Sequence, residues 1–214
     1  MRLVWVAFLA AFLPWVAGAD AASDARAAER LEVALKGLSS LRAGFRQTVT
    51  DIQGAQTESA EGTVALARPG KFRWDYRTPP QLIVSDGTTV WLYDVDLAQV
   101  TIRPAADSLS GTPALLLSGQ SDLRGEFAIA DGGEADGFAW CRLTPKNADS
   151  DFRELSVGIK GGELRRMVLV DRLGQTMSIE FDRIERNPRL DASTFSFTPP
   201  PGVDVVGRAP GNGS

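Results

Sequence analysis

The chain has 214 residues, a formal net charge of −4, 43% hydrophobic residues, one cysteine and no histidine. The lack of histidine removes the commonest general base and metal ligand, and the basic residues are too interspersed with acidic ones to form a nucleic-acid footprint. The length suits one domain with a substantial core, and one cysteine cannot form an internal disulfide.

The first nineteen residues have the features of a secretory signal, which predicts an exported protein. Arg2 provides a short basic start, residues 3–16 form an apolar run, and Ala17-Gly18-Ala19 is a small-residue cleavage site. The apolar run of about 14 residues is shorter than the roughly 20 that span a bilayer. We therefore expect a soluble mature chain that begins at Asp20, and no lipid anchor, because no cysteine follows the cleavage site.

An amphipathic helix is predicted over residues 24–39, with Ser23 as its N-cap. Its apolar positions recur at spacings of three and four, which places them on one stripe that must lie against another apolar surface. The stripe consists of Leu31, Ala34, Leu35, Leu38 and Leu41.

From Arg42 onward the apolar period changes to two, which predicts a β-meander. In the strand after Arg68-Pro69, the aromatic residues Phe72, Trp74 and Tyr76 share one face. The dipeptide Asp86-Gly87 predicts a tight two-residue hairpin, since both residues tolerate a positive φ. The expected strands of this half cover residues 45–49, 64–68, 72–76, 81–85, 88–94 and 99–103.

A short apolar helix is predicted over residues 110–117, where a hydroxyl residue and then a proline begin the turn. It interrupts the meander as an inserted lid or plug would. The second half returns to strands separated by glycine turns. These strands are expected at residues 127–130, 138–143, 152–159, 164–171 and 175–184.

The resulting fold class is mostly β: an unclosed antiparallel barrel of about ten to eleven strands whose concave face is covered by short helices. We expect one domain over residues 20–206 and a flexible tail over residues 207–214. A packed core and a ligand cavity both require apolar side chains that point inward, so the pattern leaves these two alternatives open.

The polar residues give little support for an enzyme. Gly70-Lys71 lacks the remaining positions of a phosphate-binding loop, and no other nucleotide or nucleophile motif is present. Acidic residues near Asp94 and Asp131 are expected in solvated turns, although the sequence leaves open a carboxylate pair for glycoside hydrolysis. Cys141 is interpreted as a small core residue. We predict a protein without enzymatic activity, metal or cofactor.

In the order and number of its short motifs, the chain resembles the LolA family of periplasmic outer-membrane lipoprotein carriers. None of these motifs is specific alone. They are Asp20-Ala21-Ala22-Ser23-Asp24; Phe45, Gln47 and Val49-Thr50-Asp51; Arg68-Pro69, Phe72 and Trp74; Val84-Ser85-Asp86-Gly87, Trp91 and Tyr93; Gly111-Thr112-Pro113; Leu143-Thr144-Pro145-Lys146; Phe195, Phe197, Thr198-Pro199-Pro200 and Gly202-Val203.

The resemblance implies an open barrel with a helical lid over a hydrophobic cavity, which favours the cavity over the packed core. Arg68 would be the gate that bonds to the lid and holds it closed until cargo enters. The acyl-chain cavity would be lined by Phe45, Leu66, Phe72, Trp74, Trp91, Leu115, Leu116 and Leu117. Ala114 departs from the bulkier residues that relatives place after Thr-Pro.

The resemblance also implies partners. The cargo would be triacylated outer-membrane lipoproteins, the donor a LolCDE-type inner-membrane ABC transporter, and the acceptor a LolB-type outer-membrane receptor, with the carrier in the periplasm of a Gram-negative bacterium. A monomer is our default expectation. The alternative is a periplasmic lipid- or lipoprotein-sensing module of the same fold. An enzyme on a β-scaffold is a further rival, which would need a polar cluster in the cavity.

Overall fold

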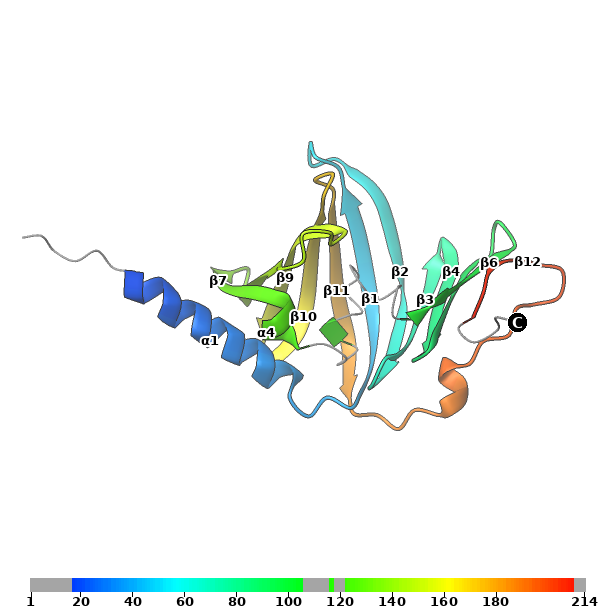
Figure 1. Ribbon diagram of the computed structural model, residues 1–214, viewed down its shortest axis with the longest axis horizontal. Coiled ribbons are helices and arrows are strands. Elements are labelled where there is room, and N and C mark those ends of the chain that lie inside the picture. Colours follow the sequence, from blue (N-terminus) through cyan, green and yellow to red (C-terminus); the bar gives the residue numbers. More distant parts are fainter. Residues whose placement is uncertain (1–16, 106–115, 118–121, 210–214) are drawn as a thin grey trace, which may run out of the picture.

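The computed structural model describes residues 17–105, 116–117 and 122–209, and these form an open, curved sheet with a long helix across one end (Figure 1). The sheet has 12 strands in the order β12-β6-β5-β4-β3-β2-β1-β11-β10-β9-β8-β7. The strands are β1 (Ser40–Thr50), β2 (Gln56–Ala67), β3 (Lys71–Thr78), β4 (Pro80–Asp86), β5 (Thr89–Asp94), β6 (Gln99–Pro104), β7 (Phe127–Ala135), β8 (Phe138–Pro145), β9 (Phe152–Lys160), β10 (Glu163–Asp171), β11 (Thr176–Arg186) and β12 (Asp204–Gly207).

Two antiparallel meanders, β1 to β6 and β7 to β11, are joined where β1 pairs with β11. The predicted mostly-β, unclosed architecture is confirmed, with one strand more than the ten to eleven expected. The additional strand is β12, which pairs in parallel with β6 and ends at Gly207, where we expected the tail to begin. Its residues lie in a Gly/Pro-rich segment without an alternating pattern, so the sequence gives no strand signal there.

The helix α1 (Ala17–Leu35) starts and ends earlier than the predicted residues 24–39. Ser23 is therefore inside the helix and does not cap it, and its hydroxyl donates to the carbonyl of Asp20 at 2.8 Å. The predicted apolar stripe is confirmed in part. All five residues are buried, but only Leu31, Ala34 and Leu35 lie on α1, whereas Leu38 follows the helix and Leu41 lies on β1. Among the described residues, no helix is long and apolar enough to cross a membrane.

The hairpin between β4 and β5 turns one residue later than predicted. The strands end at Asp86 and resume at Thr89, so Gly87 and Thr88 form the turn. Gly87 has a φ of 99°, which favours glycine, and the Asp86 carboxylate accepts the N–H groups of Thr88 and Thr89 at 2.8 Å each. The side chain of Asp86 therefore organises the turn without forming part of it.

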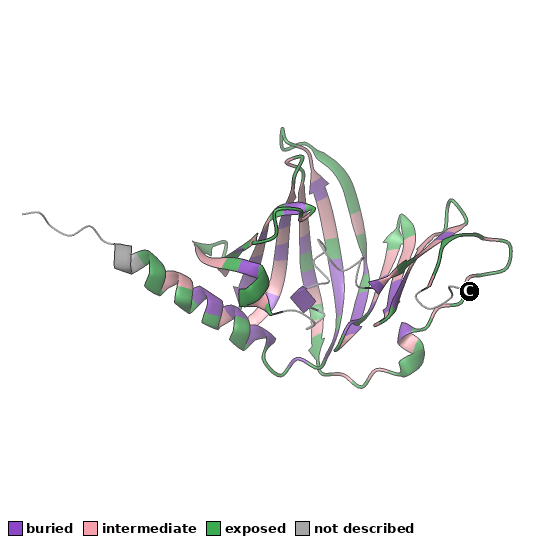
Figure 2. Cartoon of the chain, viewed as in Figure 1, coloured by how far each residue is buried: buried purple, intermediate pink, exposed green. Residues whose placement is uncertain are grey.

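The two faces of the sheet are distinguished by strand register. The inner face is defined here as the face that carries Phe72, Trp74 and Tyr76, and strand pairing extends it through Phe45 to Cys141 on β8, whose sulfur contacts α1. Figure 2 shows the buried residues along the C-terminal half of α1 and across the central strands. The main core therefore lies between the inner face and the helical segments. Two further short helices are α4 (Leu123–Glu126) and η1 (Ala192–Phe195).

Candidate functional site

The centre of the inner face is a group of packed aromatic rings. The Phe45 ring lies 4.8 Å from the Trp74 ring and 4.9 Å from the Tyr76 ring, both edge to face, and Trp74 lies 6.1 Å from Phe181. The Tyr76 hydroxyl donates to Gln47 Oε1 at 3.2 Å, and burial raises the Tyr76 pKa to about 12. This polar pair lies within an otherwise apolar surface.

Six of the residues that the family resemblance assigns to a cavity meet in one buried cluster with the apolar residues of α1. Leu116 and Leu117, which are helical, cover it beside α1 and are 2% and 4% exposed. Leu115 and the rest of the predicted helix over residues 110–115 lie outside the described residues. The six residues are Phe45, Leu66, Phe72, Trp74, Leu116 and Leu117.

Trp91 does not join this cluster. It pairs with Val84 and Ile102 on the opposite side of the sheet, the outer face, and its ring lies 6.5 Å from that of Phe197. Both turns between β3 and β5 are short, so alternation carried from Trp74 through β4 places Trp91 on the opposite face. The sequence therefore contains the information that places Trp91 on the outer face. An analysis that considers the alternation within each strand separately misses it.

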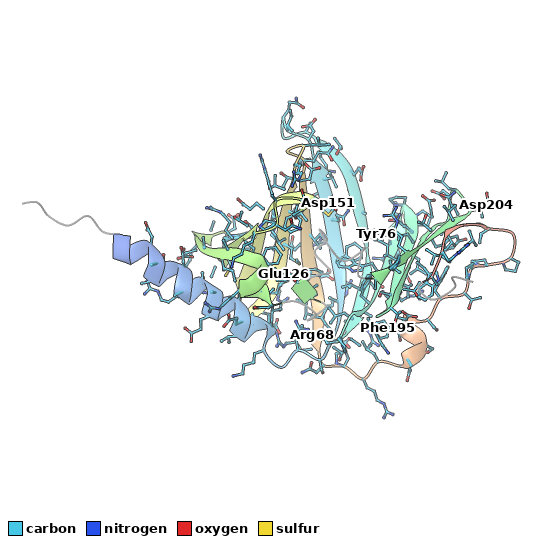
Figure 3. The ribbon with its side chains drawn as sticks, in the orientation of Figure 1. Arg68, Tyr76, Glu126, Asp151, Phe195 and Asp204 are labelled. Atoms are coloured by element: carbon cyan, nitrogen blue, oxygen red, sulfur yellow. The ribbon has the colours of Figure 1, made fainter. Side chains whose placement is uncertain are left out.

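Arg68 lies where the sheet, α1 and Leu117 meet, directly after β2. Its Nε donates to the carbonyl of Leu117 at 3.0 Å, and its Nη1 donates to the carbonyl of Leu35 at 3.3 Å. Its backbone N–H donates to the carbonyl of Ser39 at 2.8 Å. Figure 3 shows Arg68 at the end of the sheet near the C-terminal end of α1. One guanidinium thus bridges α1 and the cover formed by Leu116 and Leu117.

The charge of Arg68 sits in an environment that disfavours it and is balanced by carbonyl oxygens. Burial, and secondarily the positive charge of Arg186, lower the pKa of Arg68 from its usual value. A guanidinium nevertheless remains charged at neutral pH. The carbonyls at the C-terminal end of a helix carry partial negative charge, so they stabilise a cation at this position.

The end of α1 receives a second set of donors from residues that the sequence analysis did not select. The last turn of α1 has no basic residue of its own. Arg186 donates from Nη1 to Ala34 O at 2.8 Å and from Nη2 to Lys36 O at 3.3 Å. In the sequence, Arg186 is one more charged residue at a strand end, and no local pattern distinguishes it.

One crevice at the edge of the cover leaves little free space. The crevice between the end of α1, Leu117 and strands β10 and β11 has a volume of about 10 Å³. That is no more than the roughly 10–15 Å³ needed for one water molecule, so an acyl chain can enter here only if the cover moves. Outside the cover, Arg68 also lines an open groove of about 560 Å³ beside α1.

The polar side chains singled out in the sequence have structural roles. Asp94 ends β5 and accepts the N–H of Leu97 in the following turn at 3.0 Å. The turn expected at Asp131 is wrong, because Asp131 lies within β7 at a register irregularity, where its carboxylate accepts the N–H of Gly133 at 3.1 Å. Cys141 is buried, its sulfur donates to Ala27 O at 3.2 Å, and burial raises its pKa. Within the described ranges, no three His, Cys, Asp or Glu residues are grouped so that they could hold a metal ion.

Comparison with known proteins gives consistent matches over most of the chain. The family model for "Outer membrane lipoprotein carrier protein LolA" matches residues 36–198. An outer-membrane lipoprotein carrier protein of Dechloromonas aromatica is 47% identical over 187 residues, 87% of this chain and 90% of that protein. Another, from Methylobacillus flagellatus, is 44% identical over 211 residues, 97% of this chain and 100% of that protein.

A solved structure shows the same fold. An uncharacterized conserved protein from Thermus thermophilus aligns with a TM-score of 0.52 at 15% identity, covering 86% of this chain and 98% of that one. At this level of identity the likeness concerns the fold alone.

Proposed function

The chain belongs to the LolA family of outer-membrane lipoprotein carrier proteins, and we propose that it carries triacylated lipoproteins across the periplasm with their acyl chains on the inner face of the sheet. The observation that carries the proposal is the bridge formed by Arg68, which ties Leu117 to α1 above a surface of apolar and aromatic side chains. Arg68 acts as the gate, and the six clustered cavity residues form the acyl surface with the aromatic rings around Trp74.

Physical chemistry explains why such cargo needs a carrier. Burial of an acyl chain gains about 0.8 kcal/mol per methylene, and a triacylated cysteine has dozens of methylenes. The inner face offers apolar area of this kind, and the crevice beside Leu117 at the end of α1 is narrow, with a volume of about 10 Å³. We propose that loading requires the cover to open, and the cost of opening keeps the affinity for cargo below what the acyl area alone would give.

The direction of transport must come from partners. The sequence has no nucleotide-binding motif, so we propose that an energised donor of the LolCDE type loads the carrier at the inner membrane. A LolB-type receptor at the outer membrane, with higher affinity for the acyl chains, would then unload it. A closed state stabilised by Arg68 favours unloading, because cover closure and acyl binding compete.

The test is release of newly synthesised lipoprotein from spheroplasts by the purified mature chain. We expect outer-membrane-destined lipoprotein to appear in the soluble fraction in an equimolar complex with the carrier. A known carrier serves as a positive control for the donor transporter. If that control releases cargo and this chain does not, the carrier proposal is wrong, and a lipid-sensing binding module of the same fold replaces it.

The gate is tested in the same assay with Arg68→Leu. This variant keeps the apolar stem and loses both carbonyl contacts, so it should still accept lipoprotein but fail to pass it to the receptor. Arg42→Leu is the matched control, because the Arg42 side chain is about half exposed and pairs with Glu185 away from the cover. Equal transfer by Arg68→Leu and the parent protein would contradict the gate assignment while leaving the carrier proposal intact.

A further inference from the structure

The inner face carries one pair of polar side chains, Gln47 and Tyr76, for which acyl binding alone gives no reason. The Tyr76 hydroxyl donates to Gln47 Oε1 at 3.2 Å. We propose that the amide nitrogen of Gln47 donates to a carbonyl oxygen of an ester or amide that joins an acyl chain to the cargo, and that Tyr76 is a positioning residue that orients Gln47. The proposal rests on the proposed function and names the chemical group that this part of the acyl surface recognises.

Gln47 has hydrogen-bond donors that the protein does not use. A glutamine side chain has one carbonyl acceptor and two N–H donors. The carbonyl accepts from Tyr76, whereas the amide nitrogen has no hydrogen-bond partner within the described residues. Gln47 is half-buried, so water can reach these donors in the cargo-free protein. An acyl chain that displaces this water leaves the donors unpaired unless it also brings an acceptor.

The Tyr76 ring is held by its neighbours, which fixes the position of its hydroxyl. The ring lies 4.9 Å from that of Phe45, edge to face, and 6.4 Å from that of Trp74, stacked. The carbonyl and the nitrogen of an amide diverge from the same carbon, so a hydrogen bond to Gln47 Oε1 also sets the direction of the two N–H groups. Tyr76 therefore acts on the cargo through Gln47, which is the residue that contacts it.

The pair lies at a border between an apolar and a polar part of the inner face. Strand pairing places Phe45, Gly62 and Tyr76 in one row across the sheet, which continues into polar residues on β4, β5 and β6. The next row toward the Arg68 end is apolar from β1 to β5. In Figure 3, Tyr76 lies above Arg68, toward the other end of the strands. The polar residues are Gln81, Asp94 and Gln99, and the apolar row consists of Ala43, Val64, Trp74, Ile83 and Leu92.

An acylated cysteine has the same division into an apolar and a polar part. Its hydrocarbon chains are apolar, and ester or amide carbonyls join them to the polar glyceryl group and the peptide. The hydrophobic effect is non-directional, so apolar contact alone does not fix how far a chain lies along the strands. A hydrogen bond at the border does fix it, because it places the linkage beside Gln47 and the chain on the apolar rows.

A purely structural account of the pair makes a different prediction. A buried tyrosine hydroxyl needs an acceptor, and Gln47 supplies one whether or not cargo is bound. On that account the amide nitrogen stays with water, and the affinity for cargo depends on the acyl chains alone. On our account the affinity also depends on the carbonyl of the linkage. Cargo analogues that differ only in this carbonyl separate the two accounts.

The first experiment measures equilibrium binding of two lipopeptides to the mature protein. Both carry a cysteine with two hydrocarbon chains of equal length, joined through esters in the first and through ethers in the second. The parent should bind the diester about 3- to 10-fold more tightly, the factor of one neutral hydrogen bond. In Gln47→Met this preference should disappear through weaker binding of the diester. Gln175→Met is the matched control and should keep the preference, because Gln175 is exposed in the turn before β11.

A triacylated lipopeptide identifies which carbonyl is recognised, because it adds an amide-linked chain to the two ester-linked ones. A loss of affinity in Gln47→Met that appears already with the diester assigns the contact to an ester. A loss confined to the triacylated lipopeptide assigns it to the amide. No loss with either lipopeptide, or an equal loss with the diether, would overturn the proposal. Unchanged binding of the diether also shows that the variant is folded.

The positioning role of Tyr76 is tested in the same assay with single and double variants. Tyr76→Phe should weaken binding of the recognised lipopeptide by about 2- to 3-fold and leave the diether unchanged, because the Gln47 amide keeps its donors but loses their fixed direction. Added to Gln47→Met, it should cause no further loss, since Tyr76 acts through Gln47. Additive losses would show that Tyr76 itself contacts the cargo, which would contradict the positioning role.

The same measurements separate the polar contact from the carrier proposal. If the parent binds all three lipopeptides and Gln47→Met changes none of the affinities, the carrier proposal stands and the polar contact is wrong. If the parent binds none of them, the proposed function fails, and the polar contact fails with it.

Discussion

The inner and outer faces of the sheet both carry aromatic clusters, but their covers are attached differently. On the outer face, Trp91 and Tyr93 contact Phe197, and the segment that contains Phe197 continues into the sheet as β12. On the inner face, Leu117 is tied to α1 through the side chain of Arg68. Apolar composition therefore does not identify the binding face. The proposed function places the acyl chains on the inner face, whose cover is joined to α1 through side-chain hydrogen bonds of Arg68.

The largest expected difference between the faces is in stability. Trp74→Ala removes a ring that is 6% exposed and contacts three other aromatic rings, so we expect a loss of about 3–5 kcal/mol in the free energy of unfolding. Trp91→Ala removes a half-buried ring and should cost about 1–2 kcal/mol. Urea unfolding at neutral pH measures both. Equal losses of unfolding free energy in the two variants would contradict the distinction between the faces, since the outer aromatic cluster would then contribute as much to the core as the inner one.

The pH dependence of stability sharpens the description of the inner face. Tyr76 has a pKa near 10 when unfolded and about 12 when folded, because burial disfavours the phenolate. The unfolded chain therefore loses this proton first, and stability is full below pH 10 and falls between pH 10 and 12. A difference of this size corresponds to about 3 kcal/mol.

Tyr76→Phe isolates this contribution, since lysines also titrate in that range. As the pH rises from 9 to 12, the parent should lose stability relative to Tyr76→Phe, because the variant has no phenol to ionise. A constant difference would show that the Tyr76 hydroxyl is open to water in the folded protein.

The smallest effect concerns the cover of the outer face. Phe197→Ala should lower the free energy of unfolding by about 1–2 kcal/mol, because the ring is partly exposed, and should leave binding of a triacylated lipopeptide unchanged. Leu173→Ala is the control, since that side chain is 79% exposed and should change stability by less than about 0.5 kcal/mol. Loss of lipopeptide binding in Phe197→Ala would assign part of the acyl surface to the outer face.

Much of the architecture could be predicted from local patterns. The helical stripe of Leu31, Ala34 and Leu35 and the alternation of Phe72, Trp74 and Tyr76 each identify an inward face from residues near one another in the sequence. The face of Trp91 depends on pairing carried across two turns, and β12 has no local signal because its pairing with β6 supplies the reason for the strand.

The candidate site likewise contains some features that local sequence patterns predict and others that depend on contacts between distant residues. Arg68 and most of the apolar lining follow from residues near one another in the sequence and from the resemblance to the family. Arg186 acts on Ala34 across 152 positions, and helix α1 begins before the apolar stripe that indicates it. Contacts of this range depend on how β11 and α1 meet, which no short segment encodes.

The most direct test of the account compares two adjacent residues of β5 that face opposite sides. Leu92 packs against the inner cluster and Trp91 faces Phe197, so a photoreactive benzoylphenylalanine at either position samples one face only. With a triacylated lipopeptide bound, irradiation should crosslink lipopeptide to the variant at position 92 and not to the variant at position 91. Crosslinking at position 91, or equal crosslinking at both positions, would contradict the claim that the inner face receives the acyl chains.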